Sequence, residues 1–156
     1  GVMLAGAILG PRRGALALVV FLALVALGLP LLAGGRGGLG VFAGPSVGYL
    51  VGFPTAAFAV GALTWAVGAP YRVGWGIVAN VVGGVVVLNV LGIAGMMMRA
   101  DLSLATAITT ALVFVPGDLI KAVLCALVAR SVHTASPGRL PASHFHQRPE
   151  DADARV

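Results

Sequence analysis

Residues 102–129 read LSLATAITTALVFVPGDLIKAVLCALVA, a long apolar run whose only charges are Asp118 and Lys121. Two residues three positions apart on a helix share a face, about 60° apart around the axis. A charge in the hydrocarbon of a bilayer is costly, so such residues usually face a partner, a cavity or a transport pathway. The stretch therefore predicts a membrane helix with a polar site, and Asp118 and Lys121 are its first candidates.

The composition of the whole chain is that of a membrane protein. Hydrophobic residues make up 59% and charged residues 10% of its 156 positions, and the mean hydropathy is +1.03. Soluble domains carry roughly 25% charged residues. The formal charge is +5, but the arginines stand singly or in pairs between apolar runs. This spacing is typical of loops that flank membrane spans, and it argues against nucleic-acid binding.

Five apolar runs predict an all-α, polytopic membrane helix bundle. They cover about residues 1–10, 14–33, 46–69, 74–98 and 103–130. The first run is too short for a bilayer core of ~30 Å, which needs about 20 helical residues, so we expect the sequence to lack its N-terminal part. Pro116 predicts a kink in the last helix, because proline removes a backbone hydrogen bond.

Two regions follow from these runs. Residues 1–130 are the expected membrane bundle, and residues 131–156, rich in proline, serine and histidine, are expected to form a disordered tail. Small residues four positions apart favour close helix contacts within the bundle; the pairs are Gly6 and Gly10, Gly48 and Gly52, and Ala57 and Gly61.

The positive charges predict the orientation of the bundle. Loops on the cytoplasmic side of a membrane are enriched in arginine and lysine. Successive loops alternate between the two sides, and the richer side holds Arg12, Arg13, Arg72, Arg130, Arg139 and Arg148, against Arg36 and Arg99 on the other. We therefore expect the segment from Gly34 to Pro45 outside the cell and the C-terminus in the cytoplasm.

Other polar residues are weaker candidates. The glycine-rich segment 34–45 is either a flexible linker or an outer lid with Arg36 as its cation; it lacks the Lys-Ser/Thr ending of a phosphate loop. Tyr49 follows this segment and is either a ligand contact or an interfacial anchor. Asn80 and Asn89 are nine positions apart, 180° around an ideal helix, and asparagines in membrane helices favour interhelical hydrogen bonds slightly over ligand contacts.

No metal or catalytic set is expected. Cys125 is interpreted as a small apolar filler within a helix. The histidines of the tail, His133, His144 and His146, are interpreted as solvated residues, because no helix or further cysteine organises them.

Four motifs occur in order along the chain: GPRRG at 10–14, GLP at 28–30 running into AGGRGG at 33–38, GPxxGYLxGF at 44–53, and PGDxxK at 116–121. Together they resemble the BioY family, the biotin-specific S component of energy-coupling factor (ECF) transporters, over about residues 1–130. The resemblance implies a six-helix S-component fold, of which this sequence lacks the first helix. It implies a bacterial or archaeal multi-pass membrane protein that captures biotin from outside.

The resemblance also implies partners and site residues. The partners are a transmembrane T component and two ATPase subunits, which use the ATP; the chain itself needs no cofactor. Asp118 and Lys121 match the family's site residues in the last helix. In the family the glycine-rich loop is taken to cover the pocket, which makes Gly35, Arg36 and Tyr49 second-rank candidates. Asn80 is a further candidate ligand contact.

Several alternatives remain open. The same pair suits an S component for another vitamin or small carboxylate, or a proton-coupled secondary carrier. An intramembrane enzyme with Asp118 and Lys121 as acid and base lacks a nucleophile or metal set. In a purely structural subunit, the two charges neutralise each other or bind a neighbouring helix.

Overall fold

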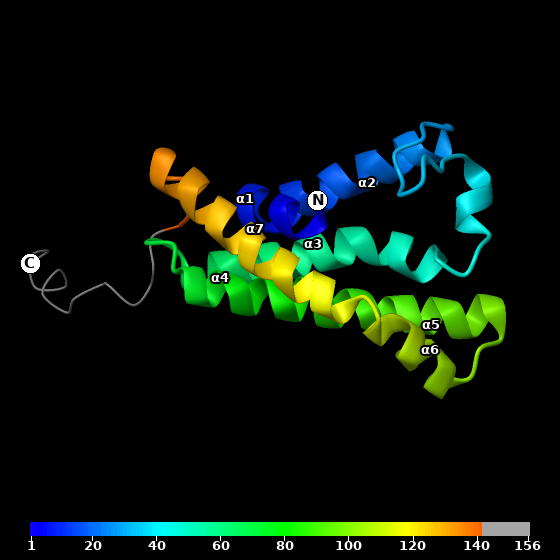
Figure 1. Cartoon of the computed structure of the whole chain (residues 1–156). Helices are drawn as coiled ribbons and strands as arrows, with labels where there is room; N and C mark the ends of the chain where they lie inside the picture. Colours follow the sequence, from blue (N-terminus) through cyan, green and yellow to red (C-terminus); the bar gives the residue numbers. More distant parts are fainter. Residues whose placement is uncertain (142–156) are drawn as a thin grey trace, which may run out of the picture.

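The computed structural model describes residues 1–141 as a bundle of helices (Figure 1). Within these residues no strand is formed, and an isolated β-bridge joins Leu32 and Arg36. This confirms the predicted all-α fold. The elements in chain order are α1 (Val2–Leu9), α2 (Pro11–Ala26), the 3-10 helix η1 (Leu39–Phe42), α3 (Val47–Val67), α4 (Val73–Ala79), the π-helix η2 (Asn80–Val87), α5 (Leu88–Ala100), α6 (Leu104–Leu112) and α7 (Val115–Ala135).

Two helices are long and apolar enough to cross a membrane. They are α3, with 21 residues, and the continuous α4–η2–α5 unit from Val73 to Ala100, with 28 residues. At 1.5 Å per residue, 20 helical residues reach across a core of ~30 Å. The helices α6 and α7 pass the same test together, although they are bent by 49° relative to each other. If this pair counts as one span, the described part of the chain has three.

The helix α2 is shorter than the apolar run at 14–33 predicts. It has 16 residues and ends at Ala26, so it measures about 24 Å. Gly28 follows with a φ of +104°, a conformation that suits glycine and interrupts a right-handed helix. Pro30 then prevents the helix from resuming. Residues 27–33 therefore belong to the connection between α2 and α3.

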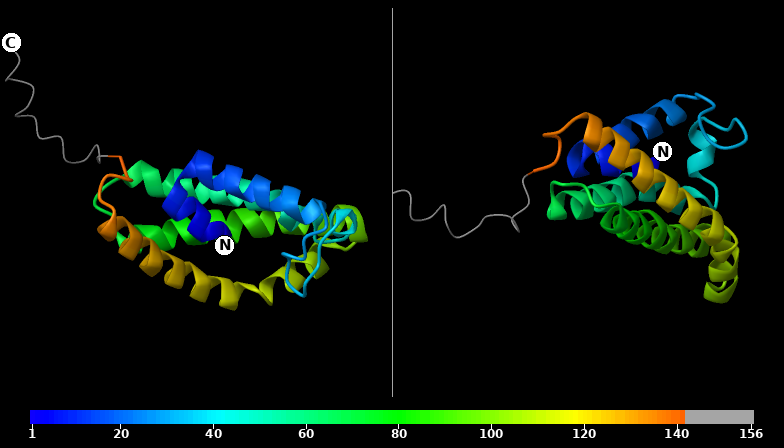
Figure 2. Two further views of the ribbon diagram at one scale, coloured as in Figure 1. Left: turned by 90° about the horizontal axis from the view of Figure 1, so that it is seen from above. Right: turned by 60° about the vertical axis from the view of Figure 1, so that its left-hand side comes forward.

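The helix α3 lies between α1 and α2 on one side and the α4–η2–α5 unit on the other (Figure 1 and Figure 2), and it packs against α1, α2, α5 and η2. Its close contacts occur at the small residues that the sequence predicts. A Cβ on Gly6 would collide with the carbonyl of Ala57, and one on Gly61 would lie 2.6 Å from the carbonyl carbon of Gly10. A Cβ on Gly48 would lie 2.8 Å from the Cα of Gly95. Backbone approach at glycine therefore sets the spacing of these helices.

The interior is built mostly from alanine and glycine, and the exterior from large apolar side chains. Several alanines of α1, α3 and α7 are completely or almost completely buried, while many leucines and valines on α2 and α7 are exposed. An apolar surface of this extent is stable only in lipid. The chain is a membrane-embedded protein.

The bundle extends further toward the C-terminus than the predicted boundary at residue 130. The helix α7 continues to Ala135, and His133 within it is only 7% exposed. The carbonyl of Pro141 accepts a hydrogen bond of 2.9 Å from the amide of Ala69. Residues 131–141 therefore pack against the bundle, because tertiary contacts outweigh their polar composition. His144, His146 and Arg148 lie outside the described residues.

Candidate functional site

Asp118 and Lys121 form an ion pair at the start of α7. The Nζ atom of Lys121 lies 3.0 Å from Oδ1 of Asp118, and the side chains are 68% and 20% exposed, respectively. Asp118 lies in the first turn of α7, where the unpaired amides and the positive end of the helix dipole stabilise a carboxylate. The acid is thus held in place, while the lysine ammonium is accessible.

The break between α6 and α7 creates this helix start. Pro116 lies in the first turn of α7, and the 49° bend falls just before it, at Val113 and Phe114. The predicted interruption at Pro116 is confirmed, because proline is tolerated in a first turn but not in a helix interior. Without the break, Asp118 would lie in the middle of a helix and would lose the dipole's stabilisation.

Tyr49 of α3 is hydrogen-bonded to α5. Its hydroxyl donates a hydrogen bond of 3.2 Å to Oδ1 of Asn89 in α5, and Nδ2 of Asn89 donates one of 2.8 Å to the carbonyl of Val85. Tyr49 and Asn89 therefore join α3 to α5 through polar side chains.

Asn80 has a different environment. It is fully buried, and its Nδ2 donates a hydrogen bond of 2.9 Å to the carbonyl of Ala122, next to Lys121 in α7. Its Oδ1 has no hydrogen-bond partner within the described residues. The amide thus ties α7 to the π-helix, which is the interhelical role that asparagines in membrane helices favour.

Asn89 was not predicted as a site residue, and the π-helix explains why. The prediction placed Asn80 and Asn89 180° apart on an ideal helix. The π-helix η2 starts at Asn80 and runs to Val87, two residues before Asn89. Its wider i→i+5 turn rotates each residue by less than an α-helix does. The two asparagines therefore lie closer in angle than the ideal geometry predicts.

The glycine-rich segment lies at the end of the bundle from which α3 starts. Gly34, Gly35 and Gly38 have φ values of +77°, +68° and +83°, which few other residues adopt. The amide of Gly38 donates a hydrogen bond of 2.7 Å to the carbonyl of Val25, which ties the segment to α2.

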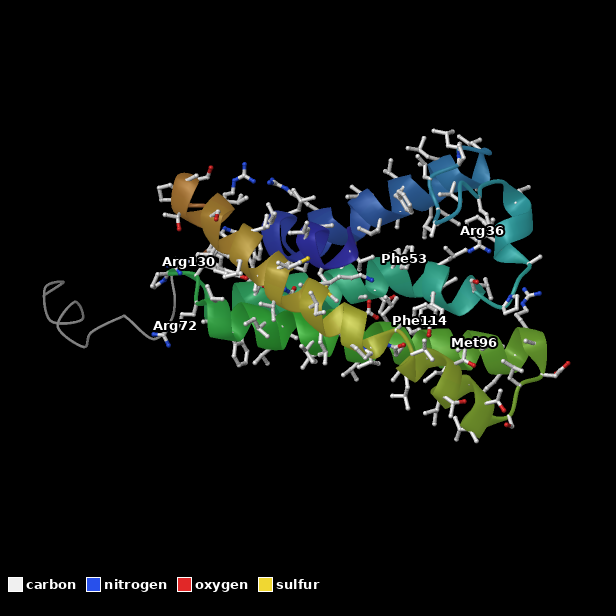
Figure 3. The ribbon with its side chains drawn as sticks, in the orientation of Figure 1. Arg36, Phe53, Arg72, Met96, Phe114 and Arg130 are labelled. Atoms are coloured by element: carbon white, nitrogen blue, oxygen red, sulfur yellow. The ribbon has the colours of Figure 1, made fainter. Side chains whose placement is uncertain are left out.

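Arg36 is exposed and forms no ion pair with Asp118. Its Nε donates a hydrogen bond of 3.3 Å to the carbonyl of Ala33. Figure 3 shows Arg36 between the glycine-rich segment and α3, with Phe53 and Phe114 further along the bundle. The structure thus pairs Asp118 with Lys121 and joins Tyr49 to Asn89. It leaves Arg36 and Gly35 in the loop and uses Asn80 for helix packing.

The sequence model of the BioY family matches residues 1–138. The chain belongs to the BioY family.

Individual relatives agree with this assignment. The chain is similar to the biotin transporter BioY of Rhodobacter capsulatus, 45% identical over 150 residues, which cover 90% of this chain and 78% of the relative. It is similar to the biotin transporter BioY of Rhizobium etli, 45% identical over 143 residues, with 88% and 76% covered. The probable biotin transporter BioY of Bacillus subtilis is 41% identical over 140 residues, with 86% and 72% covered.

A solved structure resembles the fold of this BioY family member. It is the S-component for biotin from an ECF-type ABC transporter, with a TM-score of 0.77 and 33% identity, covering 86% of this chain and 72% of that one. The resemblance to the BioY family and its S-component fold is therefore confirmed. The family match also includes residues 131–138, in agreement with the packing of α7 beyond residue 130.

Proposed function

We propose that this chain is the biotin-capture subunit of an ECF-type biotin uptake transporter, and not an enzyme. The family match, the names of the relatives and the likeness to a biotin S-component support this function. The observation that carries the proposal is the Asp118–Lys121 ion pair at the start of a broken membrane helix. An ion pair in an apolar span is costly, and a ligand that uses both charges offsets that cost.

The two charges match the polar groups of biotin. Its ureido ring carries two N–H donors and one carbonyl acceptor, and its side chain ends in a carboxylate. A carboxylate such as Asp118 accepts from N–H groups, and an ammonium such as Lys121 donates to a carbonyl or pairs with a carboxylate. We propose that Asp118, held in the first helical turn, orients the ligand. The exposed side chain of Lys121 then changes its conformation to bind the carbonyl or the carboxylate of biotin.

Neighbouring residues complete the proposed site. We propose that Tyr49 contacts the same ligand, with its hydroxyl held in place by the hydrogen bond to Asn89. Arg36 and Gly35 belong to the glycine-rich segment, which we propose closes over biotin, with Arg36 as a second cation for the carboxylate. The apolar part of the ligand suits walls of valine, leucine and phenylalanine.

The proposed orientation places the glycine-rich segment outside and the C-terminus in the cytoplasm, because arginines are enriched at the opposite end of the bundle. The proposed partners are a transmembrane T component and two ATPase subunits. Capture by this chain would then precede release that the ATPases drive.

Biotin binding to the purified chain tests the function and the site. We expect Asp118→Asn and Lys121→Ala each to weaken binding by about tenfold or more, since hydrogen bonds to charged groups contribute about 1.5–3 kcal/mol. Arg99→Gln, which changes an arginine at the end of α5, is the matched control and should bind like the parent. Parental affinity in both site variants would refute the site, and a parent that binds another vitamin but no biotin would refute the function.

A further inference from the structure

One end of the bundle carries a set of exposed arginines, here called the arginine rim. The helix α2 begins at this end, α3 and α7 end there, and the connection from α3 to α4 crosses it. Within residues 1–141 the only acids are Asp101, beyond the far end of α5, and Asp118, which pairs with Lys121. The rim therefore has no acidic partner in the described part of the chain; its members are Arg12, Arg13, Arg72, Arg130 and Arg139.

A buried cluster holds the helix ends that carry the rim. Nε2 of His133 lies 2.9 Å from the carbonyl of Ala7, which joins α7 to α1. The ring of Tyr71 stacks on His133 with centroids 5.1 Å apart. A Cβ on Gly10 would lie 2.8 Å from the Trp65 ring, so the α1–α2 corner rests directly on the end of α3. The cluster thus fixes three helix ends and one loop relative to one another.

The rim arginines stand next to members of this cluster. Arg12 follows Gly10 by two residues, Arg72 follows Tyr71 directly, and Arg130 precedes His133 by one helical turn. The hydrogen bond from Ala69 to Pro141 holds the segment of Arg139 against the same end. Figure 3 shows Arg72 and Arg130 at this end of the bundle. The guanidinium groups are therefore presented from a rigid platform and not from a flexible tail.

We propose that the arginine rim binds the headgroups of anionic phospholipids in the adjacent leaflet. Guanidinium groups match phosphate oxygens in two-point hydrogen bonding. Basic residues between membrane helices on the cytoplasmic side are typical sites for anionic headgroups. Trp75 lies near the same end, 38% exposed, and its indole nitrogen donates to the carbonyl of Leu63 at 2.8 Å, as is typical of an aromatic residue at the membrane interface.

The distribution of the rim favours lipid over a protein partner. The elements α2 and α4 lie on opposite sides of the bundle at this end (Figure 1), and both begin beside rim arginines. Lipids surround a membrane protein on all sides, whereas a partner protein covers one face. Charge complementarity on both sides therefore fits a shell of anionic headgroups.

Spin-labelled lipids test the proposal on the full chain reconstituted in phosphatidylcholine. The measurement is the fraction of spin-labelled phosphatidylglycerol immobilised at the protein, relative to spin-labelled phosphatidylcholine. We expect a preference for phosphatidylglycerol that falls in the triple variant Arg12→Gln, Arg13→Gln, Arg130→Gln, by up to about fivefold for each arginine that contacts a headgroup. The matched control is Arg99→Gln at the opposite end, which should keep the parental preference.

Four outcomes would overturn the inference. The first is an unchanged preference in the triple variant with a parental circular dichroism spectrum, and the second is an equal loss in Arg99→Gln. The third is a preference for phosphatidylglycerol that appears only after deletion of residues 142–156. It would show that the acids of that segment, Glu150, Asp151 and Asp153, bind the rim in place of lipid. The fourth is an unchanged lipid preference with reduced recovery of co-expressed transporter subunits, which would assign the rim to an acidic protein surface.

Discussion

The amide of Asn80 donates a hydrogen bond of 2.9 Å to the backbone carbonyl of Ala122, the residue that follows Lys121. This bond joins the π-helix in the second apolar span to the helix that carries the ion pair. Because Asn80 is fully buried, no water can replace the bond. The position of α7, and with it the Asp118–Lys121 pair, therefore depends on a residue in another span.

Replacement of Asn80 by alanine should loosen α7. We expect a loss of about 0.6–2 kcal/mol of stability, the range for hydrogen bonds between membrane helices, and a weaker affinity for biotin because the ion pair shifts. Thermal unfolding in detergent and a biotin titration measure the two effects. In the comparison variant Ser131→Ala, a hydroxyl that bonds only within α7 is removed, and stability should hardly change. Parental stability in Asn80→Ala would show that the bond does not anchor the helix.

Gly48 sets the distance between α3 and α5. A side chain there would collide with the backbone of Gly95 and of Leu91. Backbone atoms cannot avoid the collision by a change of rotamer. We expect Gly48→Val to cost at least about 1–3 kcal/mol, the typical range for overpacking. Gly74 in α4 has open space around its Cβ position, so Gly74→Ala should be neutral or stabilising by up to about 1 kcal/mol. Equal unfolding temperatures for the two variants would contradict this account of the interface.

His133 links α7 to α1 at the arginine rim. His133→Ala removes the hydrogen bond to Ala7 and the ring that packs between Tyr71 and Trp65. We expect a loss of about 1–3 kcal/mol, because a buried carbonyl is left without its partner. Thr134→Ala is the matched control: its hydroxyl bonds only within α7 and is exposed. If both variants unfold at the same temperature, His133 does not join the helices.

Tyr71 should give the protein a characteristic alkaline sensitivity. Burial, with a smaller contribution from Cys125, raises the pKa of Tyr71 from its ordinary 10.0 to about 12. The folded state thus favours the neutral phenol. This contribution to stability is complete below pH 10 and is lost as the pH rises through about 12. Unfolding followed by circular dichroism at a series of alkaline pH values measures the loss.

Tyr71→Phe keeps the stacked ring and removes the ionisation. We expect the variant to be less sensitive than the parent within that pH window. The phenolate absorbance that the folded parent gains near pH 12 from Tyr71 should be missing from the variant. Identical alkaline stability curves for parent and variant would contradict the assignment.

Local features of the sequence were sufficient for much of the architecture. Hydropathy alone places the spans at 46–69 and 74–98, which the structure confirms as α3 and the α4–η2–α5 unit. Pro116 predicts the break before α7, and three-residue spacing places Asp118 and Lys121 on one face. These features depend on the residue and its near neighbours, because helix geometry and transfer into lipid act over a single span.

Only the tertiary structure decided how these parts meet. The bonds of Tyr49 to Asn89, Asn80 to Ala122 and His133 to Ala7 join residues 40, 42 and 126 positions apart. No local pattern encodes such pairs. The π-helix changes the rotation between the two asparagines, and the contacts of His133 and Pro141 draw residues 131–141 into the bundle. The sequence alone thus determined which residues are costly to place in lipid, and the packing of distant segments determined which partner each one has.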